Sequence, residues 1–284
     1  KHGEGGNITY CFAHAEHMKK ESAVLFLAKG KHNLTYEGEI RPPCEVHVMG
    51  QAGAWIAGYA EPIKLKGMQH PFPESGGGRF RLLRAATGST FTNVRWENRN
   101  IHCVVASQGS CVLFQDCTLR CEAFHYVSAA WASEGAFLAF KGCTIGGVDK
   151  IRQATNGLVL EGSTGLLDGC RVEYCWGACV LVAMNSSAVV QNSVLFDSHS
   201  ALAATDGKLH KEDEFLVEGS VELVNNTIKV VDEWRDADKT QTYINANNTW
   251  LEQDFPELGY VLDKHHQKVC VCVRACVCVC VCVC

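Results

Sequence analysis

The sequence predicts an all-β protein in which short parallel strands wind into a solenoid. First, a four-residue phrase occurs six times between residues 90 and 230: a polar residue, a small or thiol residue, any residue, and a large apolar residue. Second, the second positions of the copies lie 23, 26, 27, 23 and 33 residues apart, a spacing typical of solenoids. Third, apolar runs of three to six residues alternate with Gly, Asn and Ser turns, and are too short for helices. The copies begin at Asn93, Asp116, Gly142, Gly169, Asn192 and Asn225.

The phrase has a simple explanation if each copy belongs to one coil of the solenoid. The turns bend the chain rather than reverse it, so each strand pairs in parallel with the same strand of the next coil, about 4.8 Å away. The first position of the phrase then lies at a corner, where Asn, Asp and Gly tolerate the left-handed backbone conformation. The small residue and the large apolar residue both face inward, because side chains alternate along a strand. We therefore expect an internal ladder of Cys117, Cys143, Cys170 and Ser193.

These units resemble the right-handed parallel β-helix repeats of the pectin-lyase-like superfold. The closest resemblance is to the "NCTI" repeat of F-box-type β-helix substrate receptors and of many uncharacterised proteins. The resemblance covers about residues 22–232 and implies a single-stranded right-handed parallel β-helix. It implies little about activity, because this superfold includes lyases, hydrolases, isomerases and non-catalytic binders.

Both ends of such a solenoid need a cover, because an open end exposes unpaired strand backbone. Residues 1–21 are predicted to form the N-terminal cap, and the apolar positions of residues 8–20 indicate a short amphipathic helix. The coils are predicted over residues 22–232. They begin with an apolar strand within residues 23–34 and a first full turn within residues 44–58, and both resemble the opening elements of the superfold.

The C-terminal part of the chain departs from the repeat. The 33-residue spacing indicates an insertion at residues 204–215, whose charges predict a surface loop. Residues 233–268 are predicted to form the last coil and a C-terminal cover. Residues 269–284 are a low-complexity Val-Cys tail with seven of the 17 cysteines. We expect this tail to be unstructured or to be an artefact of a translated dinucleotide repeat.

Composition excludes some classes of function and leaves the compartment open. A net charge of −5 argues against nucleic-acid binding, and no apolar run approaches the roughly 18 residues of a membrane span. The ten cysteines outside the tail fall mostly at repeat positions, which favours reduced thiols and an intracellular setting. Five Asn-x-Ser/Thr sequons point the other way. Since the chain starts at Lys1, we expect its N-terminus to be incomplete.

The sequence lacks the motifs of the polysaccharide-cleaving enzymes of this superfold, which need paired acids on neighbouring coils. Asp116 and Asp168 occupy different places in the phrase, and each is explained by turn chemistry. Of three tryptophans that would suit sugar stacking, Trp96 is expected in the interior, and Trp131 and Trp176 in turns. We therefore assign no catalytic residue and expect neither a metal nor a cofactor.

Two histidines and an arginine provide the candidate ligand site. His102 and His125 each lie eight residues after the small position of their repeat, and Arg152 lies nine residues after that position in the next one. If stacking preserved this spacing, the imidazoles would lie about 5 Å apart beside Arg152, an arrangement suited to a small polar or anionic ligand. The alternative, which we favour, is that the histidines pack at a corner and bond to backbone carbonyls.

These observations favour a non-catalytic binding or scaffold protein that presents an outer sheet face to a protein or glycan partner. The alternative is a carbohydrate-active enzyme of the pectin-lyase-like type, either a polysaccharide lyase or a glycoside hydrolase. A third interpretation is the β-helix half of a longer receptor with an adaptor domain upstream. The sequence leaves the ligand, the binding face and the oligomeric state open.

Overall fold

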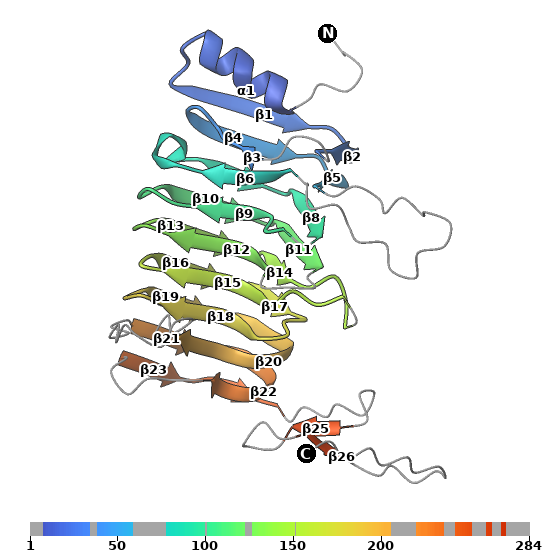
Figure 1. Cartoon of the computed structure of the whole chain (residues 1–284), viewed down its shortest axis with the longest axis vertical. Coiled ribbons are helices and arrows are strands. Elements are labelled where there is room, and N and C mark those ends of the chain that lie inside the picture. The colour runs from blue at the N-terminus through green and yellow to red at the C-terminus, as the bar shows by residue number, and fades with distance from the viewer. Residues whose placement is uncertain are drawn as a thin grey trace. The chain divides into compact units, whose positions relative to one another are not determined.

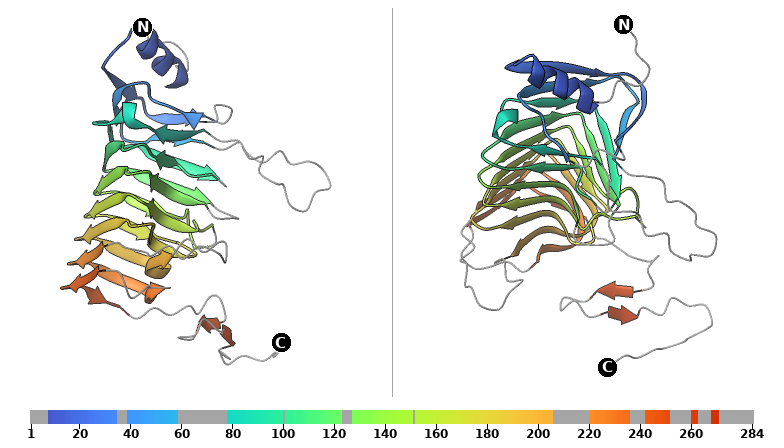
Figure 2. Two further views of the ribbon diagram at one scale, coloured as in Figure 1. Left: turned by 60° about the vertical axis from the view of Figure 1, so that its left-hand side comes forward. Right: turned by 45° about the horizontal axis from the view of Figure 1, so that its top comes forward.

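The structure is a computed structural model. It describes residues 8–34, 39–58, 78–99, 101–122, 127–150, 152–205, 220–235, 242–251, 260–262 and 268–270. Residues 1–251 form one compact unit and residues 252–284 another. The first unit is a right-handed parallel β-helix, as the repeat predicted, with its rungs stacked along the long axis in Figures 1 and 2.

One wall of the β-helix is a nine-stranded parallel sheet. In pairing order its strands are β1 (Ser22–Leu27), β4 (Glu45–Gly50), β7 (Thr90–Thr92), β10 (Cys111–Gln115), β13 (Phe137–Lys141), β16 (Thr164–Asp168), β19 (Ser187–Gln191), β21 (Ser220–Val224) and β23 (Thr242–Ala246). A short 3₁₀ turn, η1 (Arg84–Ala86), precedes β7.

The other two walls form two rows of strands within one 15-stranded sheet. The first row contains β2 (Gly30–Asn33), β5 (Ala54–Ala57), β8 (Arg95–Arg99), β11 (Thr118–Glu122), β14 (Thr144–Gly146), β17 (Arg171–Glu173), β20 (Val194–Thr205), β22 (Thr227–Arg235) and β24 (Thr249–Trp250). The second contains β3 (Glu39–Ile40), β6 (Arg79–Leu82), β9 (Val104–Ala106), β12 (Ser128–Ser133), β15 (Asn156–Glu161) and β18 (Ala178–Ala183). Strand β20 joins the rows because it pairs with both β17 and β18.

The strands pair in the register that the phrase predicted. Thr118 lies opposite Arg95 on one side and Thr144 on the other, and Arg171 and Val194 continue the row. The corner residues adopt the left-handed conformation, with φ between 53° and 63°, as expected for the bend. These corner residues are Asn93, Asp116, Gly142, Gly169, Asn192 and Asn225.

The predicted ladder of small residues is confirmed. Cys117, Cys143 and Cys170 are buried. The backbone N–H of Cys117 points at Sγ of Cys143, 3.4 Å away, and that of Cys170 donates to Oγ of Ser193 at 3.0 Å. Each thiol also donates to the carbonyl of a phenylalanine on the preceding wall, as in the 3.3 Å contact from Cys117 to Phe91.

Aromatic rings stack in the same way inside the nine-stranded wall. Phe91 and Phe114 are parallel with centroids 4.9 Å apart, and Phe114 and Phe140 with centroids 5.0 Å apart. Trp96 is fully buried, as predicted, with its ring edge-on to Phe80. The interior is therefore a column of like residues, which explains why the same residue types recur at the same place in each coil.

The N-terminal helix is shorter than the predicted segment. Helix α1 (Ile8–His17) covers the first rung, and Ile8, Phe12 and Ala15 point into the core. Met18, which the helical spacing placed on the same face, lies beyond the helix and is 49 % exposed. No helix in the described part of the chain is long and apolar enough to span a membrane.

The coils continue through β23 and β24 to Leu251. In the second unit, β25 (Tyr260–Leu262) pairs antiparallel with β26 (Lys268–Cys270). Most of the predicted insertion (residues 206–215) and most of the Val-Cys tail (residues 271–284) lie outside the described residues.

Candidate functional site

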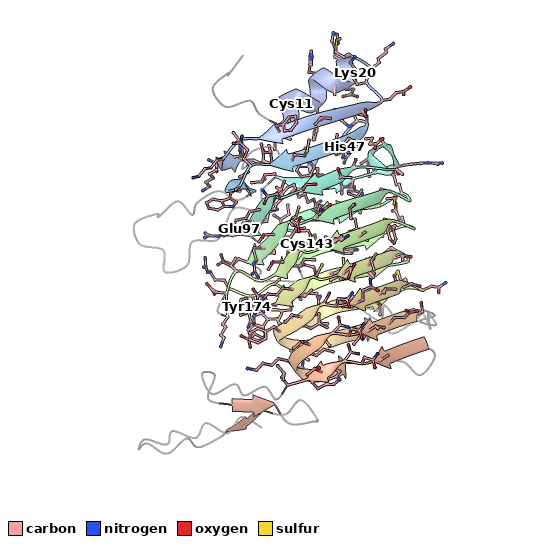
Figure 3. All side chains as sticks on the ribbon, turned by 180° about the vertical axis from the view of Figure 1, so that it is seen from behind. Cys11, Lys20, His47, Glu97, Cys143 and Tyr174 are labelled. Carbon is pink, nitrogen blue, oxygen red and sulfur yellow. The ribbon has the colours of Figure 1, made fainter. Side chains whose placement is uncertain are left out.

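The residue that follows the large apolar position of each phrase faces outward. In chain order these residues are Glu97, Arg120, Gly146, Glu173, Phe196 and Lys229. The third position of the phrase also faces outward, and it is arginine in two copies, Arg95 and Arg171. We call the following outward residues the charged face: Arg95, Glu97, Arg120, Arg171, Glu173, Phe196 and Lys229. In Figure 3, Glu97 and Tyr174 lie along this side of the stack, and Cys143 lies nearer its middle.

The carboxylates of the charged face are buried beneath arginines. Glu173 accepts hydrogen bonds from Arg171 and from Nη2 of Arg120, the latter at 2.5 Å. Arg120 lies two rungs from Glu173, and its side chain spans the rung of Gly146 that lies between them. Glu97 accepts a 2.9 Å hydrogen bond from Nη2 of Arg95. Both glutamates are therefore neutralised within the face.

Aromatic rings hold the same cations from the side. Phe196 lies between Arg171, whose Cζ is 4.6 Å from the ring centroid, and Lys229, whose Nζ is 5.3 Å away. Farther along the row, Trp55 lies between Nζ of Lys31 at 4.9 Å and Cζ of Arg95 at 5.0 Å. Cation–π contacts of this kind contribute about 0.5–1 kcal/mol each at exposed sites, so they orient the cations more than they stabilise the fold.

Two arginines of the charged face are far more exposed than its glutamates, although Arg120 is only 14 % exposed. The side chains of Arg95 and Arg171 are 53 % and 43 % exposed, whereas those of Glu97 and Glu173 are 6 % and 7 % exposed. Burial and the carboxylates of Glu173 and Asp197 raise the pKa of the neighbouring Tyr174, which keeps its hydroxyl protonated at neutral pH. The chemical groups that this surface presents to solvent are thus cationic and aromatic.

A second cluster of arginines lies at the N-terminal end of the other row. Burial would raise the pKa of Glu39, but hydrogen bonds from Arg41, Arg79 and Arg81 outweigh it and lower that pKa to about 2. Glu39 is therefore a fixed anion that holds three cations together. Such a group is structural rather than a proton donor or acceptor at neutral pH.

The structure places His102 in the interior of the corner between β8 and β9. Its Nδ1 lies 3.1 Å from the backbone nitrogen of Ser128 and 3.0 Å from its carbonyl oxygen, and its ring is edge-on to Trp131 at 4.9 Å. Burial lowers the pKa of His102 to about 4, so the ring is neutral at neutral pH. Nδ1 then accepts the N–H of Ser128, and the ring proton lies on Nε2.

The rung neighbour of His102 is Ser128, and Asn156 follows in the next rung. His125 lies outside the described residues. Arg152 precedes Asn156 by four residues and bonds to Asp149, with Nη2 to Oδ2 at 2.6 Å. Arg152 therefore does not lie in the column of His102, because the corner between the two rows of the 15-stranded sheet varies in length.

The strand pairing shows how the length of this corner varies from rung to rung. Trp96, Leu119 and Ile145 stack, and so do Val104, Ala130 and Leu158. The chain distance between the two columns is eight residues in the first of these rungs, eleven in the second and thirteen in the third. Trp131 lies on β12 and not in the predicted turn, whereas Trp176 is in a turn and 58 % exposed.

The two glutamates of the charged face do not have the spacing that an inverting polysaccharide hydrolase needs. Glu97 and Glu173 are three rungs apart, about 14 Å, which exceeds the roughly 6.5–9.5 Å between the acids of an inverting hydrolase. Asp168 accepts a 2.9 Å hydrogen bond from Asn192 at the next corner. Within the described ranges, no three His, Cys, Asp or Glu side chains are arranged to hold a metal ion.

Comparison with known proteins gives similarity at the level of the fold. No family model matches the chain, and no curated protein matches it. Among solved structures, the surface adhesin PfbA of Streptococcus pneumoniae is 9 % identical with a TM-score of 0.44, covering 86 % of this chain and 94 % of that one.

Two enzymes of polysaccharides also match. The periplasmic alginate epimerase AlgG is 10 % identical with a TM-score of 0.33, covering 80 % of this chain and 77 % of that one. A pectin methylesterase from Yersinia enterocolitica is 12 % identical with a TM-score of 0.36, covering 83 % and 90 %. These chains are β-helices like this one, and at such identities the likeness concerns the fold alone.

The sequence analysis did not identify the charged face, although the repeat contained a signal for it. Glu97, Arg120 and Glu173 follow the large apolar residue of three different copies, so aligning one further position of the phrase would have placed them in one outward column. The burial of Glu173 under Arg120 could not have been read from that alignment, because it depends on how far the arginine side chain reaches across the rung of Gly146.

Proposed function

We propose that this chain is a non-catalytic binding protein that uses the charged face of its β-helix to hold an anionic protein or glycan partner. The observation that carries the proposal is the unequal exposure of charge. Arg95 and Arg171 reach solvent, whereas the carboxylates beneath them are covered. Exposed cations at intervals along the face, beside aromatic rings, suit a partner that carries several negative charges.

The experiment measures binding to immobilised acidic glycans and acidic peptides by surface plasmon resonance. The variant Arg171→Gln with Lys229→Gln removes both cations that flank Phe196. We expect it to weaken binding at least about tenfold, because each interfacial charge contributes on the order of 1 kcal/mol or more. Lys141→Gln is the matched control, since Lys141 is an exposed cation on the nine-stranded wall. Equal binding by the double variant and the parent protein would contradict the proposal.

Turnover is tested in parallel. The protein is incubated with pectate, alginate and related uronates, and unsaturated or reducing ends are measured. We expect none above background, because the acids of the charged face are held in ion pairs. Sustained release of such ends would replace the proposal by the enzymatic alternative.

A further inference from the structure

Helix α1 covers the core of the first rung (Figure 1), but among the described strands none pairs with the outer backbone edge of β1 in the nine-stranded sheet. Among the described strands β1 pairs with β4 alone, and it is the last strand of its sheet. The carbonyl of Leu27 points toward the β4 side of the strand, where it accepts the N–H of Gln51. Because successive residues of a parallel strand bond to opposite sides, the N–H and C=O groups of Val24 and Phe26 point away from β4, toward the open edge.

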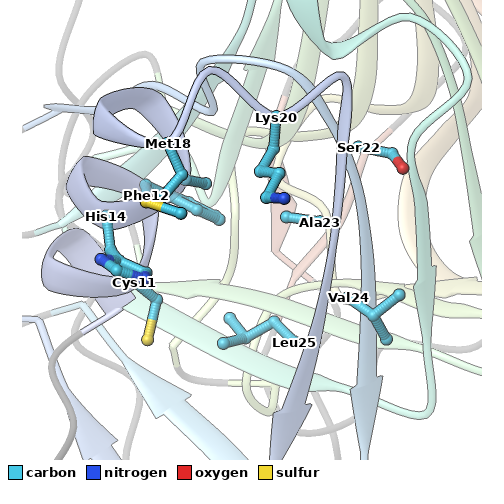
Figure 4. A pocket seen from close by; sticks show the side chains of 10 residues that line it. Cys11, Phe12, His14, Met18, Lys20, Ser22, Ala23, Val24 and Leu25 are labelled. Atoms are coloured by element: carbon cyan, nitrogen blue, oxygen red, sulfur yellow. The ribbon is translucent and has the colours of Figure 1, made fainter.

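An unfilled pocket lies on the inner side of this edge. It has a volume of about 380 Å³ between α1 and β1, within the size range of ligand pockets. Figure 4 shows Ala23 and Leu25 of β1 facing Phe12 and Met18 across it. Most of these side chains are apolar, so the pocket suits one or two apolar side chains that enter beside the strand.

The outer side of the same edge is also apolar. Phe26 is 73 % exposed and Val24 is 55 % exposed, and Met49, the partner of Phe26 on β4, is 37 % exposed. The unpaired backbone edge of β1 thus lies between two apolar surfaces, an arrangement that suits one more strand of the sheet. A strand that paired with this edge would place every second side chain in the pocket. Its other side chains would pack beside Val24 and Phe26 on the outer side of the sheet.

The charges around this edge indicate which kind of strand could bind to it, a second copy of this chain or a segment of another protein. Residues 18–31 contain four lysines (Lys19, Lys20, Lys29 and Lys31) and one acid, Glu21. Lys20 lines the pocket just before β1, and Lys29 follows just after it. Antiparallel pairing of β1 with a second copy would bring Lys20 of one copy to Lys29 of the other, which like-charge repulsion disfavours. An incoming strand with acidic ends meets complementary charge instead.

We propose that β1 binds an extended segment of a partner protein, with alternating apolar residues between acidic ends, as an added strand of the nine-stranded sheet. Main-chain hydrogen bonds to Val24 and Phe26 supply affinity, and the pocket selects the apolar side chains. The site lies at the end of the β-helix and does not use the charged face, so its test is independent of the proposed function.

The test measures fluorescence anisotropy with the full chain and a labelled peptide, Glu-Asp-Val-Thr-Val-Thr-Val-Asp-Glu. Two further peptides carry N-methyl groups on alternate amides, one on each edge of the extended peptide. We expect one methylated peptide to lose binding and the other to keep it, because only one edge faces β1. Equal binding by both peptides, or no binding by the parent peptide, overturns the proposal.

Variants of the protein give the second arm of the test. Val24→Pro removes a donor at the open edge and leaves the β4 pairing intact, so we expect a loss of at least about tenfold in affinity with an unchanged melting temperature. If that variant misfolds, Phe26→Lys makes the same test, with Met49→Lys as the matched control one strand inside the edge. Equal effects of these two lysines would contradict strand addition. So would a concentration-dependent dimer in sedimentation that Phe26→Lys abolishes, because the occupant would then be a second copy.

Discussion

His102 shows how one polar side chain is held inside the stack. Its ring accepts the N–H of Ser128 in the next rung, and Asn156 uses its Oδ1 in the same way, accepting the N–H of Ala178 at 2.9 Å. Cysteine, serine and asparagine make the equivalent contacts at the corner ladder, where Asn226 accepts the N–H of Ser193. At these bends a backbone N–H finds its acceptor in a side chain of the neighbouring rung rather than in a backbone carbonyl. Removing that side chain leaves a buried N–H donor without an acceptor.

The lowered pKa of His102 predicts a pH dependence of stability. The pKa falls from 6.5 to about 4 through burial, so between these values the unfolded chain binds a proton and the folded protein does not. The stability contributed by the neutral ring is complete above pH 6.5 and is lost as the pH falls toward 4. We expect His102→Asn to stay within about 1 kcal/mol of the parent at pH 7, since Asn156 shows that asparagine fits this position.

Urea unfolding at pH 7, 6, 5 and 4.5 measures this effect. Between pH 7 and 4.5 the variant should lose about 2–3 kcal/mol less stability than the parent protein, because a tenfold difference in proton affinity between the folded and unfolded states corresponds to about 1.4 kcal/mol. Parallel stability curves for the two proteins would show that His102 is not buried in its neutral form.

At the scale of the elements, the first corner of each coil, between the nine-stranded wall and the first row, could be predicted, and the second corner, between the two rows, could not. The first corner is one residue with positive φ at a fixed place in the phrase, such as Asn93 or Asp116, and sequence reveals it because few residue types adopt that conformation. The second corner changes length from rung to rung, so equal spacing along the chain does not place residues in one column. Spacing along the chain carries structural meaning only where the turn has constant length.

Gly146 at the end of β14 tests the packing between rungs. Its φ is 130°, and an added Cβ would lie 1.9 Å from the carbonyl oxygen of Glu173. We expect Gly146→Ala to lower the free energy of unfolding by more than about 3 kcal/mol, because both the conformation and the contact are unfavourable. Gly109→Ala is the control: its φ is +67°, but no atom lies within 4 Å of the added Cβ, so the expected cost is about 1 kcal/mol. Equal costs in guanidinium unfolding would mean that β14 and β17 are not packed as closely as described.

At the scale of the whole molecule, the repeat predicted the β-helix but not its open end. Cys117, Cys143 and Cys170 could be aligned from sequence because each coil repeats the same inward positions. The pocket beside β1 could not be predicted, because it depends on how closely α1 packs against Leu25. Ends of a repeat lack the neighbour that fixes their packing, so sequence determines them least.

One measurement tests the stacking directly. A methyl–methyl NOESY spectrum of protein labelled at Ile, Leu and Val should connect Leu119 to Ile145, Ile145 to Val172, Val172 to Leu195 and Leu195 to Ile228, since these buried side chains are partners on adjacent strands. Leu119 and Val172 should show no cross-peak, because two rungs separate them by about 9.6 Å. Absence of the neighbouring cross-peaks, with Leu119 connected instead to residues close in sequence, would contradict the parallel in-register β-helix.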